Sequence, residues 1–111
     1  MENWLEKKCL PCEGGTPKME DSKARELLET IEGWTLRDDK LNKRYEFDDF
    51  RSAMSFINHV AELAEREGHH PDFCLHGYSR VDLVLWTHAV RGLSENDFIL
   101  AAKIDALPRG E

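Results

Sequence analysis

The sequence predicts an α+β fold in which helices pack on one face of a four-stranded antiparallel sheet. Two observations lead to this prediction. Apolar residues recur at helical spacing in three separate segments, and two pairs of short, alternating segments lie between them. The expected order is helix, strand, strand, helix, strand, strand, helix. At 111 residues, the chain is long enough for one domain of that kind.

Residues 1–20 are expected to form a leader without regular structure, ahead of a domain over residues 21–111. Proline and glycine recur in the leader, and both favour loops over helices and strands. These are Pro11, Gly14, Gly15 and Pro17. The leader also carries a single C-x-x-C motif, Cys9 and Cys12.

The first helix and the first hairpin follow the leader. Helical spacing of apolar residues begins with Asp21 or Ser22 as the cap, and Gly33 is expected to stop it. Strands are then expected over 34–37 and 41–47. A polar turn between them indicates antiparallel pairing.

The clearest helical pattern covers residues 49–67. One continuous apolar stripe runs along it, and acidic residues at its start suit the positive end of the helix dipole. Gly68 can adopt the left-handed conformation that ends a helix, and Pro71 prevents its resumption. The pattern therefore predicts an amphipathic helix with defined ends.

The second hairpin and the last helix complete the fold. Strands are expected over 72–77 and 80–87, with His88 near the end of the latter and on the same side as Trp86. The last helix starts at Ser94 with a capping box in which Asp97 takes the usual glutamate position. This helix is apolar on more than one side. We therefore expect a second subunit to help cover it.

Composition excludes several classes of function. The chain has 15 Lys and Arg against 22 Asp and Glu, a formal net charge of −7, which argues against direct nucleic-acid binding. No apolar stretch approaches the roughly 20 residues that span a bilayer. Residues 1–20 lack the apolar core of a signal peptide. We expect a soluble cytoplasmic protein with no membrane contact.

The histidines do not fit a purely structural interpretation. The chain has five, and four of them lie between His69 and His88. His69 and His70 follow a predicted helix end, so their imidazoles point in different directions and can surround one small ligand. If the strand end at His88 approaches them, three imidazoles meet near the ring of Trp86. Imidazole exchanges protons near neutral pH, which suits acid–base catalysis.

The remaining histidines, His59 and His76, are interpreted as ordinary surface residues. A metal site competes with acid–base catalysis, because the clustered histidines and Cys74 are possible zinc ligands. Adjacent histidines chelate poorly from one backbone segment, however, so we predict no metal there. The cysteine pair of the leader supplies only half the ligands of a structural zinc site, so we expect no metal there within one chain and leave open a site shared between two chains. Its thiols are expected to be reduced.

Two carboxylates lie near the histidines in the sequence. Glu65 is one helical turn before His69 and could hydrogen-bond an imidazole, or it could be a solvated surface residue. Asp97 could orient a histidine, but its capping position accounts for it without an active site. For Asp97 the structural interpretation is favoured.

These residues together resemble a known family. The spacing of Glu65, the tripeptide His69-His70-Pro71, Tyr78, His88 and Asp97 resembles the signature of pterin-4a-carbinolamine dehydratases. The resemblance implies loss of water from 4a-hydroxytetrahydrobiopterin to give quinonoid dihydropterin, a step of tetrahydrobiopterin recycling.

The resemblance also implies roles for the residues. His69 and His88 match the acid–base histidines, Glu65 matches the acid that supports them, and His70 matches the histidine that orients the pterin. We expect Pro71 and Trp86 to contact the substrate as well, with Asp97 in a supporting position.

The resemblance also has implications for the fold, the cofactors and the partners. The family fold is α+β, members form homodimers or homotetramers, and the reaction uses the pterin as substrate with no metal or redox cofactor. Mammalian relatives also act as dimerisation cofactors of a transcription factor. A non-catalytic protein-binding module on the same scaffold is therefore the alternative function.

Overall fold

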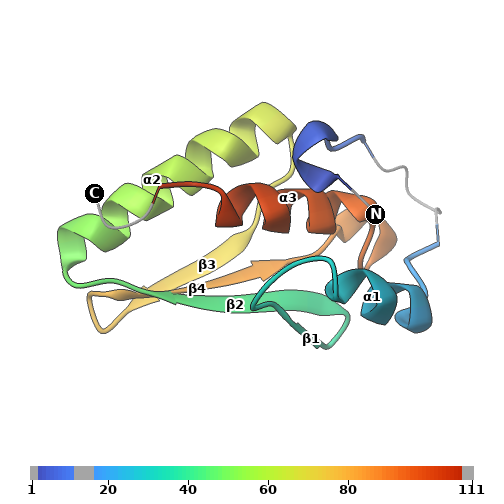
Figure 1. Ribbon diagram of the computed structural model, residues 1–111, viewed down its shortest axis with the longest axis horizontal. Coiled ribbons are helices and arrows are strands. Elements are labelled where there is room, and N and C mark those ends of the chain that lie inside the picture. Colours follow the sequence, from blue (N-terminus) through green and yellow to red (C-terminus); the bar gives the residue numbers. More distant parts are fainter. Residues whose placement is uncertain (1–2, 12–16, 109–111) are drawn as a thin grey trace.

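The computed structural model describes residues 3–11 and 17–108 and shows a sheet with helices on one side (Figure 1). The predicted α+β fold is confirmed. Its sheet has the order β1-β2-β4-β3, and each neighbouring pair is antiparallel. The elements in chain order are η1 (Trp4–Glu6), α1 (Asp21–Leu28), β1 (Thr35–Arg37), β2 (Lys40–Glu46), α2 (Phe50–Glu67), β3 (Asp72–His76), β4 (Arg80–Leu85), η2 (His88–Val90) and α3 (Glu95–Asp105).

The two central strands supply the core with alternate side chains. In their antiparallel register Leu41 lies opposite Leu85, and Tyr45 lies opposite Val81. These four side chains are at most 6% exposed and point to the helical layer. Because strand side chains alternate between faces, the intervening residues form the open face of the sheet.

Local signals define the ends of α2 as predicted. Asp49 is its N-cap, and its Oδ1 accepts a hydrogen bond from the Ser52 backbone N–H at 2.7 Å. That hydrogen bond holds the pKa of Asp49 below its usual value. Gly68 ends the helix with φ 66°, a left-handed conformation that glycine adopts without strain. None of the helices in the described residues is long and apolar enough to cross a bilayer.

The expectations for α1 were wrong at both ends. Its N-cap is Glu20 rather than Asp21 or Ser22, with no side-chain hydrogen bond to the helix. The helix ends at Leu28, and a turn carries the chain on to Gly33. Apolar spacing continues through this turn because Ile31 is also buried, so the pattern alone overestimated the length of the helix.

The N-terminal segment and α3 cover each other. Trp4 is 3% exposed and stacks on Phe98 of α3, with ring centroids 5.9 Å apart. Its indole N–H donates to Thr30 Oγ1 at 2.8 Å. Residues 1–20 were expected to lack regular structure, yet Trp4–Glu6 form a 3-10 turn that packs into the core. In Figure 1 this turn lies beside α3 and the end of α2.

This packing removes the reason for predicting a subunit contact on the last helix. Several sides of α3 are indeed buried, and Phe98, Leu100 and Ile104 have no exposed surface. They are covered within the single chain, because the sheet, α2 and the N-terminal turn enclose the helix. The argument from an uncovered helix was wrong, since it treated the leader as lying outside the fold.

Candidate active site

A cavity of about 330 Å³ lies where α2 and β4 end. It brings together the three histidines that the sequence grouped, together with Trp86, although they come from separate loops. The lining is Leu10, Pro11, Gly68, His69, His70, Trp86, Thr87, His88, Ala89 and Asn96. The helix end at Gly68 and the loop after β4 therefore present the imidazoles to one space.

His69 is the most buried histidine of the cavity. Its side chain is 12% exposed, and its Nε2 lies 2.7 Å from Oδ1 of Asp97, which has no exposed surface. Asp97 is in the first turn of α3, whereas His69 follows α2 directly. The packing of α3 beside α2 thus creates an Asp–His pair from residues 28 positions apart.

The second oxygen of Asp97 is occupied by the capping box. Its Oδ2 accepts hydrogen bonds from the Thr87 hydroxyl at 2.8 Å and the Ser94 backbone N–H at 3.1 Å. Since these two donors use Oδ2, Oδ1 accepts from the Nε2–H of His69. The structure shows that Asp97 is both a cap and a histidine partner. The purely structural interpretation of Asp97 was therefore too narrow.

Glu65 contacts an imidazole, as the sequence suggested, but the imidazole is that of His70. Its Oε2 lies 2.6 Å from His70 Nε2, and the side chains are 75% and 62% exposed. Solvent weakens such a pair, so it orients His70 more than it stabilises the fold. Neither Glu65 nor Pro71 lines the histidine cavity. Pro71 lies in an adjoining apolar hollow of about 120 Å³ that His70 also borders.

His88 lies beyond β4 rather than near the end of it. The strand ends at Leu85, and His88 opens the 3-10 turn η2, so the predicted strand to residue 87 was too long. Thr87 instead pairs with Gly92 across a tight loop, in which Arg91 has φ 55°. This loop places the His88 ring on Trp86, with centroids 3.8 Å apart and planes at 24°.

Trp86 is itself held from two directions. Its indole N–H donates to Asp72 Oδ2 at 3.0 Å, and the Lys40 ammonium lies 4.7 Å from the ring centroid. Asp72 and Lys40 had no role in the sequence analysis, because they are distant in the chain and carry no motif. Thr87 and Asn96 were also missed, although each is adjacent to a predicted site residue, because neither belongs to the signature.

Cys9 is the cysteine of the leader that the structure describes, and its side chain is partly buried. Burial, reinforced by the nearby carboxylate of Glu67, raises the pKa of the Cys9 thiol to about 12. Its Sγ lies 3.5 Å from the Asn96 carbonyl oxygen. Cys12 lies outside the described residues. Within residues 3–11 and 17–108, no three His, Cys, Asp or Glu side chains are arranged to hold a metal ion.

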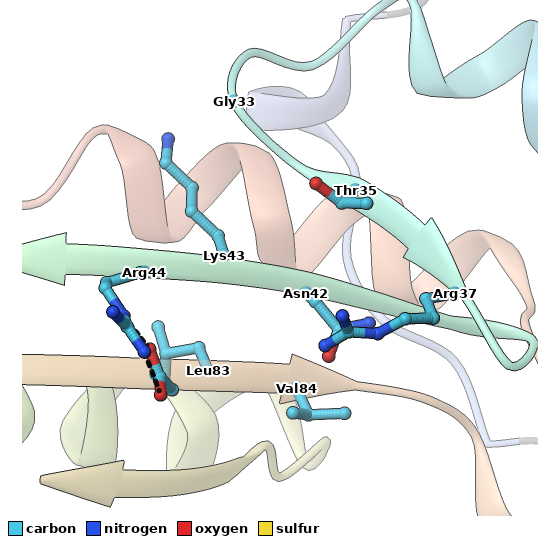
Figure 2. A pocket seen from close by; sticks show the side chains of 9 residues that line it. Gly33, Thr35, Arg37, Asn42, Lys43, Arg44, Leu83 and Val84 are labelled. Atoms are coloured by element: carbon cyan, nitrogen blue, oxygen red, sulfur yellow. Dashed lines mark hydrogen bonds and ion pairs between the residues drawn. The ribbon is translucent and has the colours of Figure 1, made fainter.

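A second cavity, of about 350 Å³, lies on the open face of the sheet (Figure 2). Two of its charged groups pair with each other, since Arg44 Nε lies 2.7 Å from Asp82 Oδ1. The Arg44 guanidinium, with help from His76 and against burial, holds the pKa of Asp82 below its usual value. His76, interpreted as a surface residue, contacts Asp82 at 2.8 Å and belongs to this face.

Tyr78 is the one signature residue that lies far from the histidines. It is 66% exposed in the turn between β3 and β4, whereas the histidine cavity lies beyond the opposite end of β4.

Residues 17–107 match the sequence model of the family described as Pterin 4 alpha carbinolamine dehydratase. The chain belongs to this family. A candidate pterin-4-alpha-carbinolamine dehydratase of Dechloromonas aromatica is 47% identical over 105 residues, which are 95% of this chain and 93% of that protein. The mitochondrial pterin-4-alpha-carbinolamine dehydratase 2 of Arabidopsis thaliana is 44% identical over 106 residues, 91% of this chain and 57% of that protein.

Solved structures of pterin dehydratase relatives share the fold. A transcriptional coactivator/pterin dehydratase from Brucella melitensis has a TM-score of 0.75 at 33% identity, covering 80% of this chain and 96% of that one. A pterin dehydratase-like protein, described as a RuBisCO assembly factor in the alpha-carboxysome, has a TM-score of 0.55 at 28% identity. The match covers 70% of this chain and 89% of that one. The family therefore includes a member described by a role in assembly.

Proposed function

We propose that this family member is an active dehydratase, which converts 4a-hydroxytetrahydrobiopterin to quinonoid dihydropterin and water. The observation that carries the proposal is the convergence of His69, His70 and His88 on one cavity. A protein-binding module has no chemical need for that arrangement, whereas a dehydratase needs groups that exchange protons near neutral pH.

The reaction requires two proton transfers. The bond between C4a and the hydroxyl oxygen breaks, and the oxygen leaves as water with a proton from a general acid. A general base removes the N5 proton, and the electron pair of that bond forms the C4a–N5 double bond. No atom outside the substrate is oxidised or reduced, so this chemistry needs only an acid and a base, without a redox cofactor.

His69 and His88 are proposed to be the two proton-transfer groups. Because Asp97 accepts from Nε2 of His69, it favours the tautomer with an unprotonated Nδ1 and stabilises the imidazolium that forms on proton uptake. The stacking on Trp86 keeps the His88 ring in one orientation. Such preorganisation contributes to catalysis because no side chain must be reoriented during the reaction.

The other predicted residues are assigned to binding and support. His70 borders the cavity and is oriented by Glu65. Trp86 both lines the cavity and stacks on His88, so we assign it to substrate binding and to positioning. Pro71 stiffens the backbone after His70 and borders the adjoining hollow. Asp97 supports His69.

The similarity to the family supports a proposal for the cellular role, the location and the oligomeric state. We propose a role in tetrahydrobiopterin recycling in the cytoplasm, by a homodimer or homotetramer that acts on a small pterin and does not bind nucleic acid directly. Sedimentation of the purified protein tests the oligomer, and a monomer at micromolar concentration contradicts it.

The experiment for the activity measures quinonoid dihydropterin by ultraviolet absorbance, from enzymatically generated 4a-hydroxytetrahydrobiopterin. His69→Ala and His88→Ala should each lower the rate by roughly 10²–10⁴-fold, the usual contribution of a general acid or base. His59→Ala is the matched control, because His59 is an exposed histidine outside the cavity. It should retain the wild-type rate.

The second candidate function is a non-catalytic binding module. The relatives described as a transcriptional coactivator and as an assembly factor favour it. The same assay separates the two functions. If the wild-type protein gives only the spontaneous rate of dehydration, the enzyme proposal is wrong and the binding module takes its place.

A further inference from the structure

One wall of the histidine cavity comes from the N-terminal segment Cys9–Pro11, called the strap below. Leu10 and Pro11 both line the cavity. Leu10 is 70% exposed, so a large apolar side chain lies at the cavity mouth with most of its surface in solvent. Small-molecule sites are mostly apolar concavities in which a few polar groups set the orientation. The strap supplies apolar surface to a cavity whose polar groups include three imidazoles.

Asn96 holds the strap at its central residue. Its Nδ2–H donates to the Leu10 carbonyl oxygen at 2.6 Å, and its Oδ1 accepts from the Leu10 backbone N–H at 2.9 Å. The amide thus bonds both backbone polar groups of one residue, as a neighbouring β-strand does. Asn96 is 8% exposed and directly precedes Asp97, the partner of His69.

Glu67 holds the strap one residue earlier. Its Oε1 accepts from the Cys9 backbone N–H at 2.9 Å, and its Oε2 lies 2.6 Å from Lys103 Nζ. Burial opposes ionisation of Glu67. The Cys9 N–H and the Lys103 ammonium outweigh it and hold the pKa of Glu67 below its usual value. The anchor is therefore a carboxylate at neutral pH. It is the last residue of α2, two positions before His69.

We propose that the strap is a substrate-binding wall and that Asn96 is its positioning residue. This inference rests on the proposed function. The planar pterin packs against Leu10 and Pro11, which covers their apolar surface. The strap offers no proton-transfer group toward the ring, so its contribution is to binding. The helix ends that present His69 and Asp97 also carry Glu67 and Asn96, which hold the strap. The strap and the imidazoles are therefore positioned by the same two helices.

The test compares Asn96→Ala and Leu10→Ala with Leu5→Ala. Leu5 is the matched control, because it is 55% exposed in the same N-terminal segment and does not line the cavity. Losing two hydrogen bonds should raise KM about tenfold in Asn96→Ala. Losing most of a leucine contact should raise it roughly fivefold in Leu10→Ala. We expect kcat to stay within about twofold of wild type, and Leu5→Ala to match wild type in both constants.

Two further measurements separate binding from folding. Calorimetric titration measures the affinity for 7,8-dihydrobiopterin, a stable pterin with the same ring system. In each variant this affinity should fall by the same factor by which KM rises. The protection of the backbone amides at positions 9 and 10 against hydrogen exchange should fall in Asn96→Ala and stay unchanged in Leu10→Ala, because Leu10→Ala keeps every backbone hydrogen bond. Leu10→Ala also tests the wall without a folding defect, since the side chain is mostly exposed.

The outcomes distinguish this inference from the proposed function. An active wild type whose Leu10→Ala and Asn96→Ala variants keep KM and dihydrobiopterin affinity within twofold overturns the strap alone. A fall in kcat at unchanged KM also overturns it, because the strap would then act on the chemistry. A wild type that neither accelerates dehydration nor binds dihydrobiopterin overturns the proposed function, and the strap inference with it.

Discussion

Replacing Asp97 by asparagine changes the proton on His69 while keeping the shape of the side chain. The carboxylate accepts three hydrogen bonds, from His69, the Thr87 hydroxyl and the Ser94 backbone N–H. An amide has one oxygen, and the two donors at Oδ2 require it there. The NH₂ group must then face His69 Nε2, which becomes an acceptor. The ring is forced into the tautomer with its proton on Nδ1, the nitrogen that we propose exchanges protons with the substrate.

The size of the effect follows from these contacts. Loss of the required tautomer removes most of the catalytic contribution of His69. We therefore expect kcat to decrease by roughly 10²–10⁴-fold. Loss of the charge weakens the hydrogen bonds and the interaction with the helix dipole, which lowers the free energy of unfolding by about 1–3 kcal/mol. The variant should therefore stay folded and lose activity. Initial rates and urea titration measure the two quantities.

Asp105→Asn is the matched control for removing a carboxylate from α3. Asp105 accepts from the indole N–H of Trp34 at 3.0 Å and from Lys43 Nζ at 2.7 Å, and it also contacts the Tyr45 hydroxyl. It lies at the other end of the helix, roughly 12 Å along the axis from Asp97. It should lower stability and leave kcat unchanged. A folded Asp97→Asn protein with at least a third of the wild-type kcat would refute the reasoning about the tautomer.

Three further predictions concern stability and thiol chemistry. Trp4→Ala should lower the free energy of unfolding by about 3–5 kcal/mol in urea titration, because it leaves a cavity against Phe98; a loss below about 1 kcal/mol would show that the N-terminal turn is dispensable. The lowered pKa of Glu67 means that its contribution to stability is present above its unfolded pKa, near 4.5, and is lost as the pH falls. The stability difference between wild type and Glu67→Gln should therefore shrink between pH 7 and pH 3, and a constant difference would contradict the assignment. With a pKa of about 12, Cys9 is roughly 10⁻⁴ thiolate at pH 8, so in a protein with Cys12→Ser and Cys74→Ser it should react with a disulfide reagent about a thousandfold more slowly after folding than in urea.

Signals that act within a few residues were readable from the sequence. The left-handed Gly68 and the capping box at Ser94 each involve hydrogen bonds between near neighbours. Strand alternation predicted which residues of β2 and β4 face the helices, because the side-chain period of a strand is two. The failures at the C-terminal end of α1 and at the end of β4 have other causes. Burial of Ile31 depends on other parts of the chain, and the tight loop in which Thr87 pairs with Gly92 carries no motif that announces the end of the strand.

The sequence by itself determined the fold class and the family, and it grouped His69, His70 and His88 as one set. Only the tertiary structure decided how they are held: Asp97 contacts His69, Glu65 contacts His70, and Trp86 stacks on His88.

The tertiary structure also decided that the N-terminal segment belongs to the core and to the cavity wall. Trp4 packs on Phe98, and Leu10 hydrogen-bonds to Asn96, across more than 80 residues of chain. The physical reason is one of range. Hydrogen-bonding and conformational preferences of neighbouring residues specify caps, turns and periodicity, whereas the partner of a side chain is chosen when whole elements pack.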